Sequence, residues 1–195
     1  MLSWAIIVYK FKIKAKPSQY QAIDEAIRTS QFIQNKCLRY WMDNKRVGKY
    51  DLNKYCAVLA AEFPWANELN SMATQSAAER AWLAISRFYD NCQKKVKGKK
   101  GFPKFKKNAR SVEYKTSGWK LSETRKAITF SDKKGIGTLK FKGTWDLNYY
   151  DIKQIKRVRL VRRADGYYAQ FAIAVNVRIE TEPTHKIVSL DLGIR

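Results

Sequence analysis

The chain has 195 residues, of which 45% are hydrophobic and 13% aromatic, and this composition excludes a disordered solvating tail. Its 39 Lys and Arg residues against 17 Asp and Glu residues give a formal net charge of +22. Such an excess attracts polyanions, so nucleic acid is the expected partner and an anionic membrane surface the weaker alternative. No stretch reaches the roughly 18 apolar residues of a membrane span, and we expect an intracellular protein.

The first half of the chain predicts one strand followed by helices. Trp4–Lys14 alternates apolar and polar residues, which is typical of a strand. A helical region begins at Pro17-Ser18, where Ser18 and Gln21 fit a capping box, and we expect a break at Thr29-Ser30. Two further helices are expected, at about Leu52–Phe63 and Ser71–Lys95, and Pro64 ends the first of them. The chain's cysteines have no zinc-ligand or disulfide-framework spacing, so we expect buried, reduced thiols at Cys37, Cys56 and Cys92.

The composition changes at Lys94. Between Lys94 and Arg110 there are nine basic residues and no acid, with glycines and a proline that oppose regular structure, so we expect an exposed basic loop. Strands follow, and Asp165-Gly166 between the last two predicts a hairpin. The expected strands are Ala127–Phe130, Thr138–Phe141, Ile155–Arg163 and Tyr167–Val177.

Aromatic and cationic side chains are interleaved in the basic loop, at Gly101-Phe102-Pro103-Lys104-Phe105-Lys106-Lys107. Rings stack on bases while ammonium groups neutralise phosphates, so this pattern favours nucleic-acid binding. The alternative is a solvated charged segment with Phe102 and Phe105 tucked into the core. The binding residues predicted in this loop are Lys99, Lys100, Phe102, Lys104, Phe105, Lys106, Lys107 and Arg110.

The first strand of the predicted hairpin is the second basic feature. Its period of two places Arg157, Arg159 and Arg163 on one face, with Val158 and Leu160 directed toward a core. Guanidinium groups engage phosphates bidentately, so the three arginines are predicted to bind a nucleic-acid backbone. A plain charged outer face fits the same pattern equally well.

Residues 188–195 form an apolar, strand-like segment with one carboxylate, Asp191, near its middle. An acid in a buried strand is costly unless it is paired or binds a metal, so this segment is typical of the first strand of a metal-dependent nuclease core. Two-metal cleavage needs several carboxylates around the ions, and no other acid after residue 150 has a clear reason to converge on Asp191. We therefore expect no self-contained catalysis.

Six motifs in a fixed order resemble the TnpB/OrfB proteins of insertion sequences, the transposon-encoded relatives of type V CRISPR effectors. They are Tyr9-Lys10-Phe11, Pro17-Ser18, Gln31-Phe32-Ile33-Gln34-Asn35-Lys36, Gly101-Phe102-Pro103-Lys104-Phe105, the hairpin from Arg157 to Val175, and Leu190-Asp191-Leu192-Gly193-Ile194.

The resemblance implies an α+β fold in which a β-barrel-like wedge domain carries an inserted helical recognition segment and is followed by an RNase H-like RuvC domain. The implied boundaries are 1–16 for the first wedge strand, 17–96 for the helical segment, 97–112 for the basic loop, 113–182 for the other wedge strands, and 183–195 for the linker and first RuvC strand. Family members use a guide RNA to find and cut DNA. By motif, Asp191 corresponds to the first catalytic RuvC aspartate, a Mg²⁺ ligand.

The partners that we expect are guide RNA and DNA, rather than a membrane or a small-molecule substrate, in the cytoplasm of a bacterium or archaeon and near its nucleoid. Ser189 stands where the family usually has glycine, and the remaining RuvC carboxylates and the four-cysteine zinc ribbon would follow Arg195. We expect residues 1–195 to bind nucleic acid without cutting it, with Mg²⁺ bound only in an intact RuvC site and with no zinc site.

Three alternatives stay open at this point. The chain is the beginning of a complete RNA-guided, Mg²⁺-dependent nuclease; or it is a sequence-specific DNA-binding module that uses helices between Ser18 and Lys95 as a helix-turn-helix; or it is the product of a decayed gene. The sequence predicts no oligomeric state.

Overall fold

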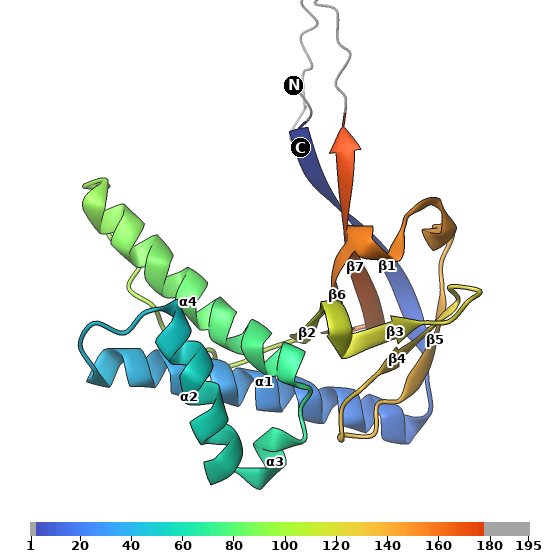
Figure 1. The fold of residues 1–195 in the computed structure, drawn as a ribbon, viewed down its shortest axis with the longest axis horizontal. Coiled ribbons are helices and arrows are strands. Elements are labelled where there is room, and N and C mark those ends of the chain that lie inside the picture. The colour runs from blue at the N-terminus through green and yellow to red at the C-terminus, as the bar shows by residue number, and fades with distance from the viewer. Residues whose placement is uncertain (1–2, 178–195) are drawn as a thin grey trace, which may run out of the picture.

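The structure, a computed structural model, describes residues 3–177 and combines one antiparallel sheet with four α-helices (Figure 1). The strands are β1 (Ser3–Lys14), β2 (Ser111–Lys115), β3 (Trp119–Leu121), β4 (Ala127–Phe130), β5 (Thr138–Lys142), β6 (Ile155–Arg163) and β7 (Gly166–Val177). The helices are α1 (Pro17–Asp43), α2 (Lys49–Glu62), α3 (Pro64–Asn67) and α4 (Ser71–Gln93). All four helices therefore lie between the first and second strands in the sequence.

The seven strands are ordered β2-β6-β7-β1-β5-β4-β3 and curl into a half-barrel. The first strand, β1, is central, because it pairs with β7 from Ser3 to Lys12 and with β5 from Lys12 to Lys14. The helical unit is thus an insertion into a sheet whose later strands close around the first one. Among the described residues, no helix has the length and apolar character needed to cross a membrane.

The β6–β7 hairpin confirms the sequence prediction. Arg163 pairs with Gly166, which leaves Ala164 and Asp165 as the two loop residues. Gly166 has a φ of +129°, a conformation that side-chain-bearing residues rarely adopt. The Asp-Gly pair therefore predicts the hairpin because the backbone at residue 166 needs the positive φ that glycine adopts without strain.

One continuous core joins the sheet to the helices. Inside the curled sheet, the fully buried Phe171 ring lies 5.5 Å from the rings of both Phe11 and Phe141. On the helical side, α4 buries alanines at three- and four-residue spacing, which allows α1 to approach closely. The buried alanines of α4 are Ala73, Ala77, Ala78 and Ala81.

Two predictions about α1 are wrong. The helix begins at Pro17 as predicted, but its N-cap residue is Lys16 and not Ser18, and Gln19, rather than Gln21, accepts a hydrogen bond through Oε1 from the N-cap N–H at 3.1 Å. The helix also continues without a break through Thr29 and Ser30, which are buried within it. The Thr29 hydroxyl donates to the Glu25 carbonyl at 2.8 Å, so its polarity is satisfied inside the helix.

Two of the strands and one of the α-helices were not predicted. Strand β2 begins at Ser111, so the basic loop ends at Arg110 and not at residue 112. β2 has only five residues, and their short alternation of polar and apolar types was not recognised as a strand signal. The others are the three-residue β3 and the single-turn α3. Pro64, which was predicted to end the preceding helix, is also the first residue of α3. The linker and RuvC strand predicted at 183–195, including Asp191, lie outside the described residues, as does the end of the predicted wedge segment.

Replacement of Phe171 by Ala is expected to lower the free energy of unfolding by about 3–5 kcal/mol, because it removes a ring from a fully packed site. Urea denaturation followed by circular dichroism measures this loss. The control is Val8→Ala on β1, where 56% of the side chain is exposed and the change is expected to be small. Equal effects of the two changes would contradict the assigned core.

Candidate nucleic-acid interface

Two side chains of α1 hold the basic loop, Lys94–Arg110, in place. Asn35 is hydrogen-bonded twice to the backbone of Lys106, as donor to its carbonyl at 2.9 Å and as acceptor from its N–H at 2.8 Å. Gln31, one helical turn earlier, accepts from the Ala109 N–H at 2.7 Å and donates to the Lys107 carbonyl at 3.2 Å. Residues at i and i+4 share one helix face, so the two amides fix the loop against α1 along one line.

Cations from separate segments of the chain meet in a hollow of about 590 Å³, the basic cavity. The loop supplies Lys106 and Arg110, whereas α4 supplies Arg80 and β6 supplies Arg159. The described residues that line it are Gln34, Arg80, Lys106, Asn108, Ala109, Arg110, Ser111 and Arg159. None of these lining residues is acidic, and their guanidinium and amide groups are donors that suit phosphate oxygens.

The wall of the basic cavity is fixed by a buried acid on β2. Glu113 is only 3% exposed, and its carboxylate accepts hydrogen bonds from Arg157 at 2.8 Å and from Arg159 at 2.7 Å. The Arg80 guanidinium, from α4, lies 3.8 Å from the same carboxylate and donates to the Ser111 carbonyl at 3.2 Å. A second acid, Glu79, pairs with Lys115 at 2.5 Å. This network joins the helical unit to the sheet.

Electrostatics keep Glu113 ionised despite its burial. Burial alone would raise the pKa of its carboxyl, but the hydrogen bonds from Arg159 and Arg157 outweigh burial and hold the pKa below 4.5, the ordinary value. The pKa of Glu79 is lowered in the same way, with burial opposed by Lys115 and Lys49. Both acids thus remain anions at neutral pH and orient the cations around them.

A second basic region lies on the outer face of the half-barrel, the side opposite the Phe171 core. We call it the basic sheet face, and its cations are Lys10, Lys12, Lys14, Lys140, Lys142 and Arg163. In the strand register, Lys12 stands directly opposite Lys142, and Lys14 directly opposite Lys140. Like charges in directly opposed positions destabilise a sheet. These pairs therefore cost folding free energy that a bound polyanion would relieve.

Tyr168 lies in the same face, beside Lys12 in the register. Three cations approach its ring, with Lys10 Nζ at 5.3 Å, Lys12 Nζ at 5.9 Å and the Arg163 guanidinium at 5.5 Å from the centroid. The ring attracts these cations through its negative face and so gathers them into one patch. Asp165, at the hairpin loop, accepts a hydrogen bond from the Tyr168 hydroxyl.

The structure brings together some of the predicted binding residues and separates others. Lys106, Arg110 and Arg159 meet at the basic cavity, whereas Arg163 lies on the basic sheet face. Arg157 binds Glu113 and does not line the cavity. Lys99, Lys104 and Lys107 are exposed on the loop, and Lys100 Nζ is hydrogen-bonded to the Val96 carbonyl.

The two loop phenylalanines lie apart. Phe105 is 45% exposed and lines a shallow hollow beside α1 with Arg28, Lys36 and Arg39. Phe102 is 54% exposed and packs near Trp41 instead. Neither ring is tucked into the core, so the alternative of two buried phenylalanines is wrong.

Several interface residues were missed at the sequence level. Arg80 and Gln34 are single polar residues on otherwise ordinary helices, and nothing in the local pattern distinguishes them. The lysines of β1 and β5 alternate with apolar residues, and this period of two is the sequence signal from which their common outward face follows. Those lysines are Lys10, Lys12, Lys14, Lys140 and Lys142.

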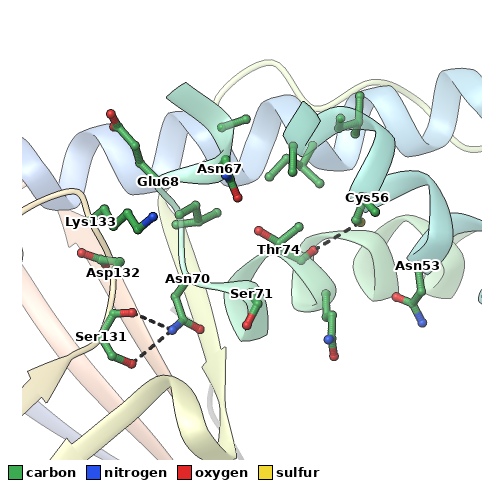
Figure 2. Close-up of a pocket in the computed structure, with 17 residues that line it drawn as sticks. Asn53, Cys56, Asn67, Glu68, Asn70, Ser71, Thr74, Ser131, Asp132 and Lys133 are labelled. Atoms are coloured by element: carbon green, nitrogen blue, oxygen red, sulfur yellow. Dashed lines mark hydrogen bonds between the residues drawn. The ribbon is translucent and has the colours of Figure 1, made fainter. Parts of the chain in front are cut away.

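A polar hollow of about 460 Å³, whose charged lining residues are Glu68, Asp132 and Lys133, lies between α2, the start of α4 and the loop before β5 (Figure 2). Amide and hydroxyl side chains line it, including Asn53, Gln75 and Thr74. Asn70 caps α4 by accepting from the Met72 N–H at 2.8 Å and donates to the Ser131 carbonyl at 2.8 Å. Asn53 Oδ1 is buried and has no hydrogen-bond partner among the described residues. Amides of this kind offer a donor beside an acceptor, the pattern that pairs with base edges.

Within residues 3–177, no group of three or more His, Cys, Asp or Glu side chains could hold a metal ion. Asp191, the predicted Mg²⁺ ligand, lies outside the described residues. Cys37 and Cys56 are buried thiols, whereas Cys92 is exposed, so the prediction that all three cysteines are buried is wrong for Cys92.

No family model matches this chain, and no curated protein matches it.

Replacement of Glu113 by Gln is expected to lower the free energy of unfolding at neutral pH by about 1–3 kcal/mol, because it leaves three guanidinium groups without their anion. A depressed carboxyl pKa contributes stability above the unfolded value of 4.5, and this contribution is lost as the pH falls through the folded pKa. The difference between the two proteins should therefore shrink below pH 4.5.

Urea denaturation at a series of pH values measures both effects. Glu123→Gln, on the exposed turn between β3 and β4, removes the same charge outside the network and serves as the control. A pH-independent difference between wild type and Glu113→Gln would show that Glu113 does not act as a buried anion.

Proposed function

We propose that this chain is the nucleic-acid-binding portion of a TnpB-like protein, which binds guide RNA and DNA. The basic cavity carries the proposal, because cations from the loop, α4 and β6 meet there and no described lining residue is acidic. In this proposal the half-barrel sheet is the wedge domain and α1–α4 are the recognition segment. The element order supports it, since one strand is followed by a helical insertion, a basic loop and the remaining strands.

The energetics of the basic sheet face support the same function. The directly opposed pairs Lys12–Lys142 and Lys14–Lys140 repel in the free protein. A phosphate backbone neutralises such lysines and releases its own counterions, so binding gains free energy from both partners. The net charge of +22 extends this attraction beyond the contact surface.

The polar hollow beside α4 adds a means of reading bases. Phosphate contacts position a nucleic acid without reading its sequence, whereas amide side chains hydrogen-bond to base edges. Gln75 and Asn53 line this hollow together with Glu68, Asp132 and Lys133, and neither amide lines the basic cavity. In this proposal, the basic cavity positions the phosphate backbone, and the amides of the hollow read the base edges.

Cleavage is not part of the proposal for residues 1–195. The proposal gives Asp191 the role of the first RuvC carboxylate, and a Mg²⁺ pair needs further carboxylates around it. The rival, a complete Mg²⁺-dependent nuclease, requires nicking by the intact protein that disappears in Asp191→Ala.

Replacement of both Lys106 and Arg110 by Gln is expected to weaken binding to structured RNA and to duplex DNA. The slope of log K against log[salt] is negative, and each lost phosphate contact reduces its magnitude by about 0.7 for single strands and about 0.9 for duplex DNA. The double variant should therefore lose about 1.4 to 1.8 from the wild-type slope. Fluorescence anisotropy titrations between about 50 and 200 mM salt give both slopes.

A matched control carries the same charge change elsewhere. Lys54 on α2 and Lys153 after β5 are both exposed and do not line the basic cavity. Their double replacement by Gln should leave the slope of log K against log[salt] nearly unchanged. Equal losses of slope in both double variants, or a wild-type affinity that does not depend on salt, would show that the basic cavity does not bind the nucleic acid. A sequence-specific footprint on DNA without RNA would favour the helix-turn-helix alternative.

Replacement of Gln75 by Ala is expected to reduce discrimination between DNA sequences by about 1–3 kcal/mol while the salt slope stays unchanged, because Gln75 offers an amide to a base edge. Selection from a randomised duplex pool, followed by titrations of the selected and unselected sequences, measures this loss. Gln93→Ala, on the exposed end of α4, is the control. A changed salt slope with unchanged sequence preference would contradict the assigned role.

A further inference from the structure

We propose that a third hollow, at the C-terminal end of α1, holds one unstacked base of a single-stranded nucleic acid. This inference rests on the proposed function and adds a class of substrate to it. The hollow, which we call the aromatic hollow, has a volume of about 310 Å³. Its described lining residues are Trp41, Met42, Asn44, Lys45, Arg46, Tyr89 and Phe102.

Three rings form the walls of the aromatic hollow. Trp41 is nearly buried, and its ring centroid lies 5.6 Å from that of Phe102 and 5.9 Å from that of Tyr89. The outer rings stay accessible, since Phe102 is 54% exposed and Tyr89 is 43% exposed. Exposed aromatic rings around a hollow offer π-faces on which a base stacks, whatever its identity.

The rings are held in position before any base arrives. Trp41 Nε1 donates to the Tyr89 hydroxyl at 2.9 Å, which ties α1 to α4. Phe102 also packs edge-on against Phe88, with centroids 5.2 Å apart. Just before Phe102, Asn91 of α4 donates to the Lys100 carbonyl at 3.0 Å. Stacking on rings that are already ordered costs little conformational entropy, which favours binding.

The charges at the aromatic hollow select a nucleic acid over other flat ligands. Lys45 and Arg46 line it, and no acidic residue does among those described. The nearby Asp43 is paired with Arg39 at 2.7 Å on the exposed side of α1. A base held between the rings would therefore place its own phosphate beside two cations. The remainder of the basic loop continues from Phe102 toward the basic cavity, which gives the adjoining phosphates a cationic path.

The test uses a short single-stranded RNA that carries 2-aminopurine, whose emission is quenched when it stacks on an aromatic ring, with an unlabelled hairpin duplex of the same length as a second ligand. The proteins are the wild type, Phe102→Ala, Tyr89→Phe and a control, Tyr50→Ala, in which an 80% exposed ring on α2 is removed. Thermal unfolding of each variant checks that it folds.

In Phe102→Ala, the affinity for the single strand is expected to fall by about 5- to 150-fold, which corresponds to about 1–3 kcal/mol for one stacked base. Quenching should be lost, while duplex affinity and its salt slope stay near wild type. Tyr89→Phe keeps the ring and should keep the quenching, and Tyr50→Ala should match the wild type throughout. This combination supports the aromatic hollow as a base site.

Other outcomes overturn the inference in distinguishable ways. Unchanged quenching and single-strand affinity in Phe102→Ala, together with salt-dependent duplex binding, would reject the base site and leave the proposed function standing. Equal losses for single strand and duplex would show that Phe102 acts only through the shape of the loop, which also rejects a base site. A wild-type protein that binds neither ligand would reject both proposals.

Discussion

The buried carboxylate of Glu113 is the constraint on which the candidate interface depends. It is 3% exposed, and a charge in that position is unfavourable unless cations surround it. Glu113 meets this requirement by drawing Arg80 from α4 and Arg157 and Arg159 from β6 toward β2. One acid thereby joins the helical insertion to the sheet and sets the wall of the basic cavity before any ligand binds.

The rest of the interface carries positive charge that the fold does not neutralise. Lys12 faces Lys142 and Lys14 faces Lys140 across strands that must pair for the half-barrel to close. Long lysine side chains reach into water, and three cations gather on the Tyr168 ring, so the repulsion is tolerated. The same charges that weaken the free protein provide the attraction for a polyanion, which links the energetics of folding to the proposed function.

Local patterns predicted the elements whose structure depends on local chemistry. The strands at 127–130 and 155–163 have the expected bounds because apolar residues alternate along them, and the hairpin loop follows from Asp165-Gly166. Packing decided the failures. Thr29-Ser30 suggested a break by composition, but burial against neighbouring elements keeps α1 helical there. In β2, Glu113 occupies a polar position of a regular alternation, and its burial depends on cations that come from elsewhere in the chain.

The sequence by itself determined the positive charge, the helical insertion after the first strand, and the interleaved cations and rings of the basic loop, because composition and short-range periodicity express these features directly. Tertiary structure alone decided which of these residues meet. Asn35 holds the backbone of a loop residue 71 positions later, and Arg80 joins Lys106 in one cavity. Such pairings depend on how α1, α4 and the sheet pack, and contacts between distant segments leave no periodic signal in the chain.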